Sequence, residues 1–146
     1  MSCFSLYGTS LSAPVITGFA ACLMQAKPSL TNRQVKEIIE KSAHLYPYGN
    51  NYVGYGVPQA ARALALLRGE ELPQTAREVR ARGKQWSMPL DQPEPLVSIF
   101  RKKDATHVLQ QEAIKPVKNQ LTIKRIVGEA RTTIDLKREV IEVIWE

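Results

Sequence analysis

The chain has 146 residues, a net charge of +6 and a hydrophobic fraction of 44%, which are the size and composition of roughly one globular domain. This composition excludes a disordered or fibrous protein. The longest nearly apolar run, residues 13–24, is shorter than the ~20 residues that span a membrane, and no Lys or Arg precedes Lys27 to begin a secretory signal. We therefore expect neither a membrane span nor a signal within this chain.

The first predicted helix covers residues 12–26 and is apolar nearly all round, with Val15, Ile16, Phe19 and Leu23 spread over its surface. Such a helix has no polar face to turn toward water, so we expect burial on every side. Pro28 ends it.

Two further helices are predicted before residue 70. Thr31 and Gln34 have the spacing of a capping box, and the apolar stripe that follows occupies one side, which indicates a surface helix. Residues 46–56 are rich in Gly and Asn, as turns are. Pro58 and Gly69 then suit the start and the end of a third helix.

The second half of the chain has a different pattern. Four prolines mark residues 70–95 as a linker, within which residues 75–82 suggest a short charged helix. Short runs rich in Val, Ile and Thr then predict a small antiparallel β-module over residues 96–146, without a catalytic motif. The runs are 96–100, 106–109, 121–127, 132–136 and 140–145.

Metal, cofactor and nucleic-acid sites are not expected. His44 and His107 stand apart from the two cysteines, and Cys22 lies in the apolar run, where a core position is the ordinary reading. Residues 1–69 hold six of the 20 basic and two of the 14 acidic residues, so fourteen basic and twelve acidic residues follow. The basic groups, including residues 101–103, are short or interrupted by acids, which indicates a solvated face rather than a nucleic-acid platform.

Residues 8–14 read Gly-Thr-Ser-Leu-Ser-Ala-Pro and precede the first helix directly. The pattern predicts a strand that turns sharply into a helix, with Ser10 at the turn. A serine at a helix start offers its free backbone N–H to a developing oxyanion, where the helix dipole also helps. A serine in this place is more often only a helix cap, so local chemistry leaves both roles open.

The longer motif resembles the nucleophile motif of the subtilisin-like serine proteases, Gly-Thr-Ser-x-Ala-or-Ser-Ala-Pro. The resemblance covers roughly residues 4–69 and continues through Gly18 and the glycine-rich turn at residues 54–57. Leu11, Val15 and Gln59 depart from the residues that are common in the family, and none of them is in its catalytic triad.

The resemblance implies an α/β domain that hydrolyses polypeptides through an acyl-enzyme, with Ser10 as nucleophile and its backbone N–H as an oxyanion donor. The family order of the triad is Asp, His, Ser, yet no Asp or His precedes Ser10, the first Asp is Asp91, and no Asn precedes Asn32. We therefore expect residues 1–69 to be the C-terminal part of such a domain, inactive without upstream catalytic-domain sequence. The family resemblance favours an exported or extracellular protein.

Other functions are left open by the sequence. A triad of Ser10, Asp91 or Asp104, and His107 would have the residue order of the α/β-hydrolases. The nucleophile motif of that fold is G-x-S-x-G, however, and Ser12 stands here in place of its last glycine. His44 fits the end of the second helix, where the dipole favours a cation. The chain could also be a non-catalytic interaction or self-association module whose apolar faces are covered by a second copy.

Overall fold

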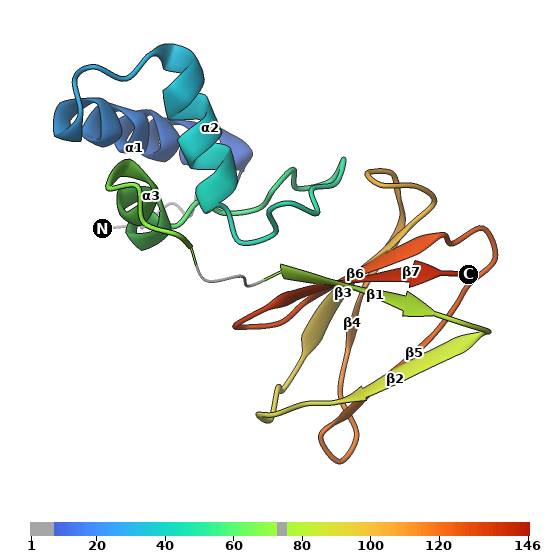
Figure 1. Cartoon of the computed structure of the whole chain (residues 1–146). Helices are drawn as coiled ribbons and strands as arrows, with labels where there is room; N and C mark the ends of the chain where they lie inside the picture. The colour runs from blue at the N-terminus through green and yellow to red at the C-terminus, as the bar shows by residue number, and fades with distance from the viewer. Residues whose placement is uncertain (1–7, 73–75) are drawn as a thin grey trace, which may run out of the picture. The chain divides into compact units, whose positions relative to one another are not determined.

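The computed structural model describes residues 8–72 and 76–146, which form a mixed α/β protein of helices followed by two sheets (Figure 1). The predicted fold class, helices and then a β-rich module, is confirmed. The chain divides into two compact units. The first contains the described residues up to Ser42 together with Pro58–Leu72, and the second contains Ala43–Val57 together with the described residues from Ala76 to Glu146.

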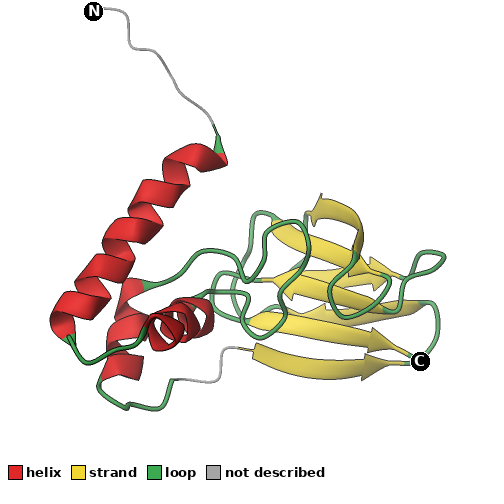
Figure 2. Ribbon diagram, turned by 90° about the horizontal axis from the view of Figure 1, so that it is seen from above, coloured by secondary structure: helices red, strands yellow, loops and turns green. Residues whose placement is uncertain are grey.

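The first unit is helical (Figure 2). A 3₁₀ helix, η1 (Thr9–Leu11), leads into α1 (Ser12–Ala26), and α2 (Asn32–Ser42) and α3 (Ala60–Leu67) follow. The predicted capping box is present before α2: the Thr31 N–H donates to Gln34 Oε1 at 2.8 Å, and the Gln34 N–H donates to Thr31 Oγ1 at 3.3 Å. Leu23, Val35 and Ala63, one from each α-helix, form the buried centre of this unit.

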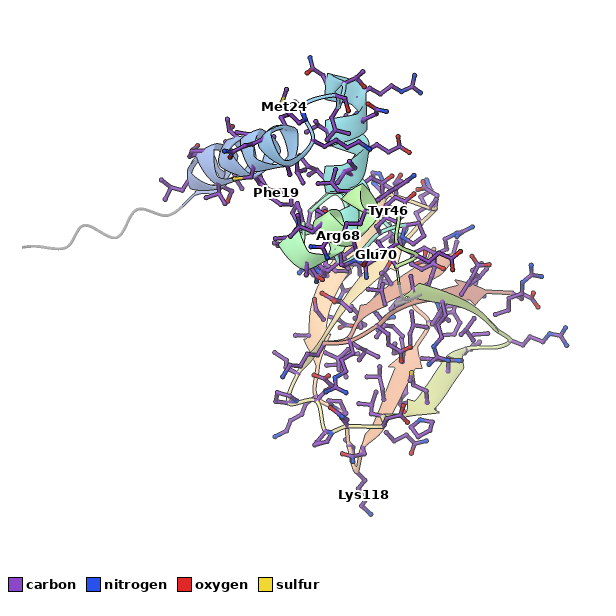
Figure 3. All side chains as sticks on the ribbon, turned by 60° about the vertical axis from the view of Figure 1, so that its left-hand side comes forward. Phe19, Met24, Tyr46, Arg68, Glu70 and Lys118 are labelled. Atoms are coloured by element: carbon purple, nitrogen blue, oxygen red, sulfur yellow. The ribbon has the colours of Figure 1, made fainter. Side chains whose placement is uncertain are left out.

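The expected burial of α1 on every side is not found within the described chain. Leu23 is the one α1 residue that is buried there, while Val15 is 69% exposed and Met24 42% exposed. Figure 3 shows Met24 and Phe19 on this helix, and Phe19 packs against the buried cluster. Cys22, expected in the core, is exposed. Two short helices cover only one stripe of α1, and its other faces meet solvent.

The helical segment Thr9–Ala26, which consists of η1 and α1, is longer than the apolar run at residues 13–24 on which the expectation of no membrane span is based. It has 18 residues at a mean hydropathy of 1.2, so within the described residues it is the one helix that is long and apolar enough to cross a membrane. The run at residues 13–24 alone predicts no such helix. Length and composition do not distinguish a membrane span from a helix of a protein core.

The second unit contains two sheets. The five-stranded sheet has the order β1-β7-β6-β3-β4, and β2 pairs with β5 in a separate antiparallel ribbon. The bounds are β1 (Ala76–Ala81), β2 (Gln85–Pro89), β3 (Val97–Lys102), β4 (Val108–Ile114), β5 (Gln120–Lys124), β6 (Arg131–Asp135) and β7 (Val140–Trp145). The five predicted strands therefore correspond to β3–β7.

The core of this unit is a row of isoleucines. Ile134 of β6 lies opposite Ile99 of β3 on one side and Ile141 of β7 on the other, and all three are fully buried. Leu121 and Ile123, two residues apart on β5, pack on the same cluster. The ribbon and the large sheet thus share one hydrophobic core, as the period-two alternation on β5 requires.

Two expectations for this region are wrong. Residues 75–82 were predicted to be helical, but Ala76–Ala81 is a strand that runs parallel to β7. Within the predicted antiparallel module, β3 pairs antiparallel with β4 and β6, and β6 pairs antiparallel with β7. Residues 85–89 form β2 within the segment predicted to be a linker. Ala, Arg and Glu favour a helix locally, but pairing of Val79 with Val143 places both side chains on the shared core, and this tertiary pairing decides the state.

The segment Ala43–Val57 lies between α2 and α3 in sequence but belongs to the second unit. Leu45, 1% exposed, packs with Phe100, Val108 and Val140. The Asn51 N–H donates to the Thr106 carbonyl at 3.0 Å, and Asn51 Oδ1 accepts from the Val108 N–H at 2.8 Å. Residues predicted to be part of the N-terminal module are therefore attached to the sheets.

Candidate functional site

Ser10 lies in the middle of η1, directly before α1. Gly8 opens this turn with φ 149°, a conformation that L side chains rarely adopt. The turn is closed by the Leu11 N–H, which donates to the Gly8 carbonyl at 3.2 Å, and by the Ser12 N–H, which donates to the Thr9 carbonyl. The strand expected before it falls on residues 1–7, outside the described residues.

The hydroxyl and the backbone N–H of Ser10 are not used in closing this turn. The side chain of Ser10 is exposed, and in the described part of the chain neither its hydroxyl nor its backbone N–H makes a hydrogen bond. An N–H at the start of a helix, with no intrahelical acceptor, is the kind of donor that stabilises an anion. The local geometry therefore suits a nucleophile with an adjacent oxyanion donor, and both roles stay predictions.

A nucleophilic serine also needs a base, and both ring nitrogens of His44 are occupied. Nδ1 accepts the Val57 N–H at 2.9 Å, and Nε2 lies 3.4 Å from Asp135 Oδ2. Burial raises the pKa of Asp135, and the neighbouring imidazole opposes that rise. His44 was expected to end the second helix, but α2 ends at Ser42. His44 instead connects the segment of residues 43–57 to β6 through Asp135.

The other residues of the alternative triad do not form a catalytic pair among the described residues. Asp104 Oδ1 accepts the backbone N–H groups of Thr106 and His107, both at 2.9 Å, and these bonds lower the Asp104 pKa. The carboxylate thus closes a turn between β3 and β4 and does not orient the imidazole of His107. Asp91 lines a pocket of about 570 Å³ on the second unit.

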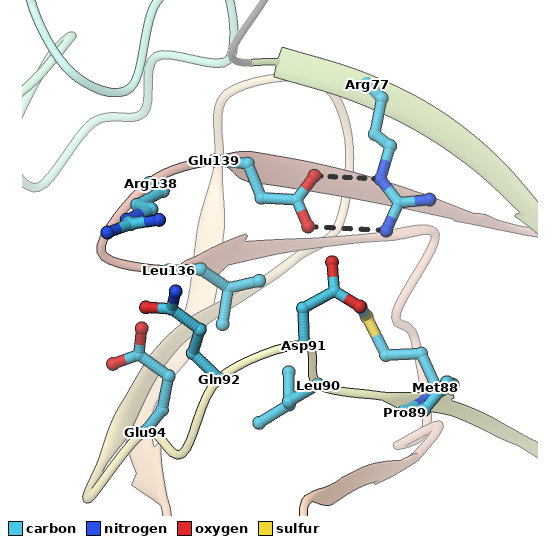
Figure 4. Close-up of a pocket in the computed structure, with 10 residues that line it drawn as sticks. All are labelled: Arg77, Met88, Pro89, Leu90, Asp91, Gln92, Glu94, Leu136, Arg138 and Glu139. Atoms are coloured by element: carbon cyan, nitrogen blue, oxygen red, sulfur yellow. Dashed lines mark hydrogen bonds and ion pairs between the residues drawn. The ribbon is translucent and has the colours of Figure 1, made fainter.

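This pocket is open and mixed in character (Figure 4). Arg77 and Glu139 form an ion pair at its rim, with Nε 3.0 Å from Oε2. None of its described lining residues is a Ser, Cys or His, so they include no serine or thiol nucleophile and no imidazole base. They are Arg77, Met88, Pro89, Leu90, Asp91, Gln92, Glu94, Leu136, Arg138 and Glu139.

Two buried charged residues lie where the sequence predicted a solvated basic face. Arg101 is 5% exposed, and its guanidinium contacts Glu112 Oε1 at 2.5 Å and Glu129 Oε2 at 3.0 Å. Lys102 is fully buried with Nζ 2.7 Å from Glu142 Oε1, and burial lowers its pKa. The expectation for residues 101–103 is wrong at these two positions, because glutamates distant in sequence neutralise them. No signal local to β3 identifies those partners.

Comparison with known families gives a match over the N-terminal part of the chain. Residues 2–56 match the model of the Subtilase family. This match contains the Ser10 motif and confirms the resemblance that the motif predicts. It ends before α3 and leaves the sheets of the second unit unmatched.

Comparison with individual proteins gives one relative. The chain is 43% identical over 68 residues to Mycosin-4 of Mycobacterium tuberculosis (strain ATCC 25618 / H37Rv). The aligned part is 46% of this chain and 14% of the length of Mycosin-4, so the two share a short segment of the longer protein. No solved structure matches the chain.

Proposed function

We propose that residues 1–69 are the C-terminal part of a subtilisin-like serine endopeptidase domain, in which Ser10 attacks the peptide carbonyl and its backbone N–H stabilises the oxyanion. The observation that carries this proposal is the motif at residues 8–14, which lies within the subtilase match and puts an exposed serine at the start of a helix. A helix start places an unpaired N–H and the positive end of the dipole beside the nucleophile.

The 146-residue chain by itself is inactive in this proposal. A serine hydroxyl is a weak nucleophile until a positioned base takes its proton, and His44 is committed to Val57 and Asp135. The Asp, His and Asn of the family order would come from upstream catalytic-domain sequence, and the substrate of the completed site would be a polypeptide. We also infer an exported location, which rests on the family resemblance.

The proposal is tested by peptidase assays on a longer chain that carries the upstream segments. Ser10→Ala should lower kcat by about 10⁶-fold, because the acyl-enzyme cannot form. Ser12→Ala, two residues away in the same turn, is the matched control and should keep most of the activity. Equal loss in both variants, or activity retained in Ser10→Ala, would show that Ser10 is not the nucleophile.

A second candidate function, self-association, is favoured by the exposed apolar residues of the helical segment Thr9–Ala26. Leu11, Val15 and Met24 are 49%, 69% and 42% exposed on a helix whose composition suits burial. Exposed apolar patches of this kind are typical of interfaces. A second copy of the chain could cover them where no upstream sequence does.

Light scattering after size-exclusion chromatography tests this association. We expect the 146-residue chain to elute as a dimer or larger, and Val15→Glu to shift it toward the monomer because a charge would be buried in the interface. Val127→Glu is the control, since Val127 is 100% exposed in a turn of the second unit. A dilute wild-type chain that stays monomeric would contradict the idea.

A further inference from the structure

The second unit contains another pocket, of about 400 Å³, which no step of the proposed hydrolysis uses. It lies between the segment that follows α2, the turn after β3, and the strands β6 and β7. Tyr48, Asn50, Tyr55, Arg131 and Glu142 are among the residues that line it. This volume is at the lower end of the range for small-ligand pockets.

Asn50 contributes a buried donor without an acceptor. Its Oδ1 accepts the N–H groups of Tyr52 at 2.9 Å and Val53 at 3.1 Å, which fixes the orientation of the amide. The residue is 6% exposed, and its Nδ2 makes no hydrogen bond within the described structure. Buried polar atoms are nearly always hydrogen-bonded in folded proteins, so we expect Asn50 Nδ2 to donate to an acceptor that is not part of the described chain.

Glu142 contributes a buried acceptor. Its Oε2 accepts the Thr133 hydroxyl at 2.7 Å. Its Oε1 forms an ion pair with Lys102 Nζ at 2.7 Å, and a carboxylate oxygen has a second lone pair that can accept another hydrogen bond. An N–H or O–H group of a ligand could donate to this oxygen.

The described charged groups at this pocket are of both signs, and Arg131 is the partly exposed cation among them. Lys102 and Glu142 neutralise each other, and both are buried. Arg131 also lines the pocket, with its side chain 34% exposed and its guanidinium 3.9 Å from Glu142 Oε1. Glu78, opposite Glu142 in the β1–β7 pairing, adds a negative charge near Tyr48. A carboxylate would therefore be recognised by the Arg131 guanidinium itself, which is suited to its planar geometry.

We propose that this pocket binds the C-terminal residue of a peptide. The terminal carboxylate accepts from Arg131 and from Asn50 Nδ2, and the amide N–H of the same residue donates to Glu142 Oε1. Tyr48 and Tyr55 line the pocket beside these groups and offer apolar surface to the terminal side chain. The site does not depend on whether Ser10 is catalytic.

Two-dimensional ¹H–¹⁵N NMR of the full 146-residue chain tests the proposal, with N-acetyl-Ala-Ala as probe and N-acetyl-Ala-Ala-amide as its uncharged counterpart. We expect saturable binding of the acid with a Kd of about 1 mM or tighter, accompanied by a shift of the Asn50 side-chain NH₂ signal. The amide should bind at least about tenfold more weakly, because it lacks the charge that pairs with Arg131.

Two variants locate the binding. Asn50→Asp keeps Oδ1 and replaces the donor with an oxygen that repels the carboxylate, and Arg131→Gln removes the charge at a partly exposed position; each should weaken binding at least about tenfold. Arg138→Gln, at the other pocket, should bind as wild type does. If Asn50→Asp fails to fold, the affinity of Arg131→Gln for the acid probe tests the proposal by itself. No saturation by about 10 mM, equal binding of acid and amide, or wild-type affinity in Arg131→Gln would overturn the proposal.

Discussion

Gly56 brings the backbone into contact with the ring of His44. A Cβ at this position would lie 2.2 Å from His44 Cε1, and φ is +80°. The close approach allows the Val57 N–H to reach His44 Nδ1 while the other ring nitrogen meets Asp135. One glycine thus permits the polar link between residues 43–57 and β6.

Gly56→Ala should destabilise the second unit by about 1–3 kcal/mol more than Gly54→Ala. Gly54 has φ +58° and nothing within 4 Å of an added Cβ, so this control carries the backbone strain without the clash. Both tryptophans, Trp86 and Trp145, lie in the second unit, and their fluorescence during urea unfolding reports its free energy. Equal destabilisation by the two substitutions would mean that the His44 contact contributes nothing.

The segment Ala43–Val57 behaves as an element of the sheet unit, although it lies between two helices of the first unit in sequence. Its apolar anchor is Leu45, and its backbone is tied to the β3–β4 turn through Asn51. The conformation of the glycine-rich turn that resembles the subtilases therefore depends on the β-module.

Leu45→Ala should lower the free energy of unfolding of the second unit by about 2–5 kcal/mol, because it leaves a cavity among Phe100, Val108 and Val140. Leu96→Ala, directly before β3 in the same unit, removes the same atoms from a side chain that is 58% exposed and should cost less than about 0.5 kcal/mol. Urea titrations followed by tryptophan fluorescence measure both. An unchanged midpoint for Leu45→Ala would show that the segment is not part of the sheet unit.

The elements that the sequence predicts well are those whose signals are contiguous. The Thr31–Gln34 capping box and the Val- and Ile-rich runs identify α2 and β3–β7 without reference to the rest of the chain. β1 is missed because Ala, Arg and Glu indicate a helix, and its strand state depends on β7, the last strand of the chain. β2 carried an unused signal, the alternation of Trp86 and Met88 with polar residues.

The same distinction holds for the site. Ser10 is identifiable because its motif is seven consecutive residues. The His44–Asp135 pair, the buried Lys102–Glu142 pair and the pocket around Asn50 join residues that are distant in sequence. No local pattern marks those partners, so only the tertiary structure brings them together.

At the scale of the whole molecule, the subtilase match covers the smaller, N-terminal part of the chain, and the strands of the two sheets lie outside it. The match covers residues 2–56, and the shared segment is 14% of the length of Mycosin-4. Ser10 stands at the start of a helix with its side chain exposed, and α1 has exposed apolar residues such as Val15 and Met24. These features agree with the proposal that Ser10 is a nucleophile whose Asp and His partners belong to upstream catalytic-domain sequence.

Labelling by a fluorophosphonate probe, located by mass spectrometry, tests this central claim most directly. The probe reacts only with a serine whose base is in place, so the 146-residue chain should remain unlabelled, and a chain extended by the upstream catalytic-domain sequence should be labelled at Ser10. Ser12, in the same turn, should be unlabelled in both. Robust labelling of Ser10 in the 146-residue chain, or none in the extended chain, would contradict the account.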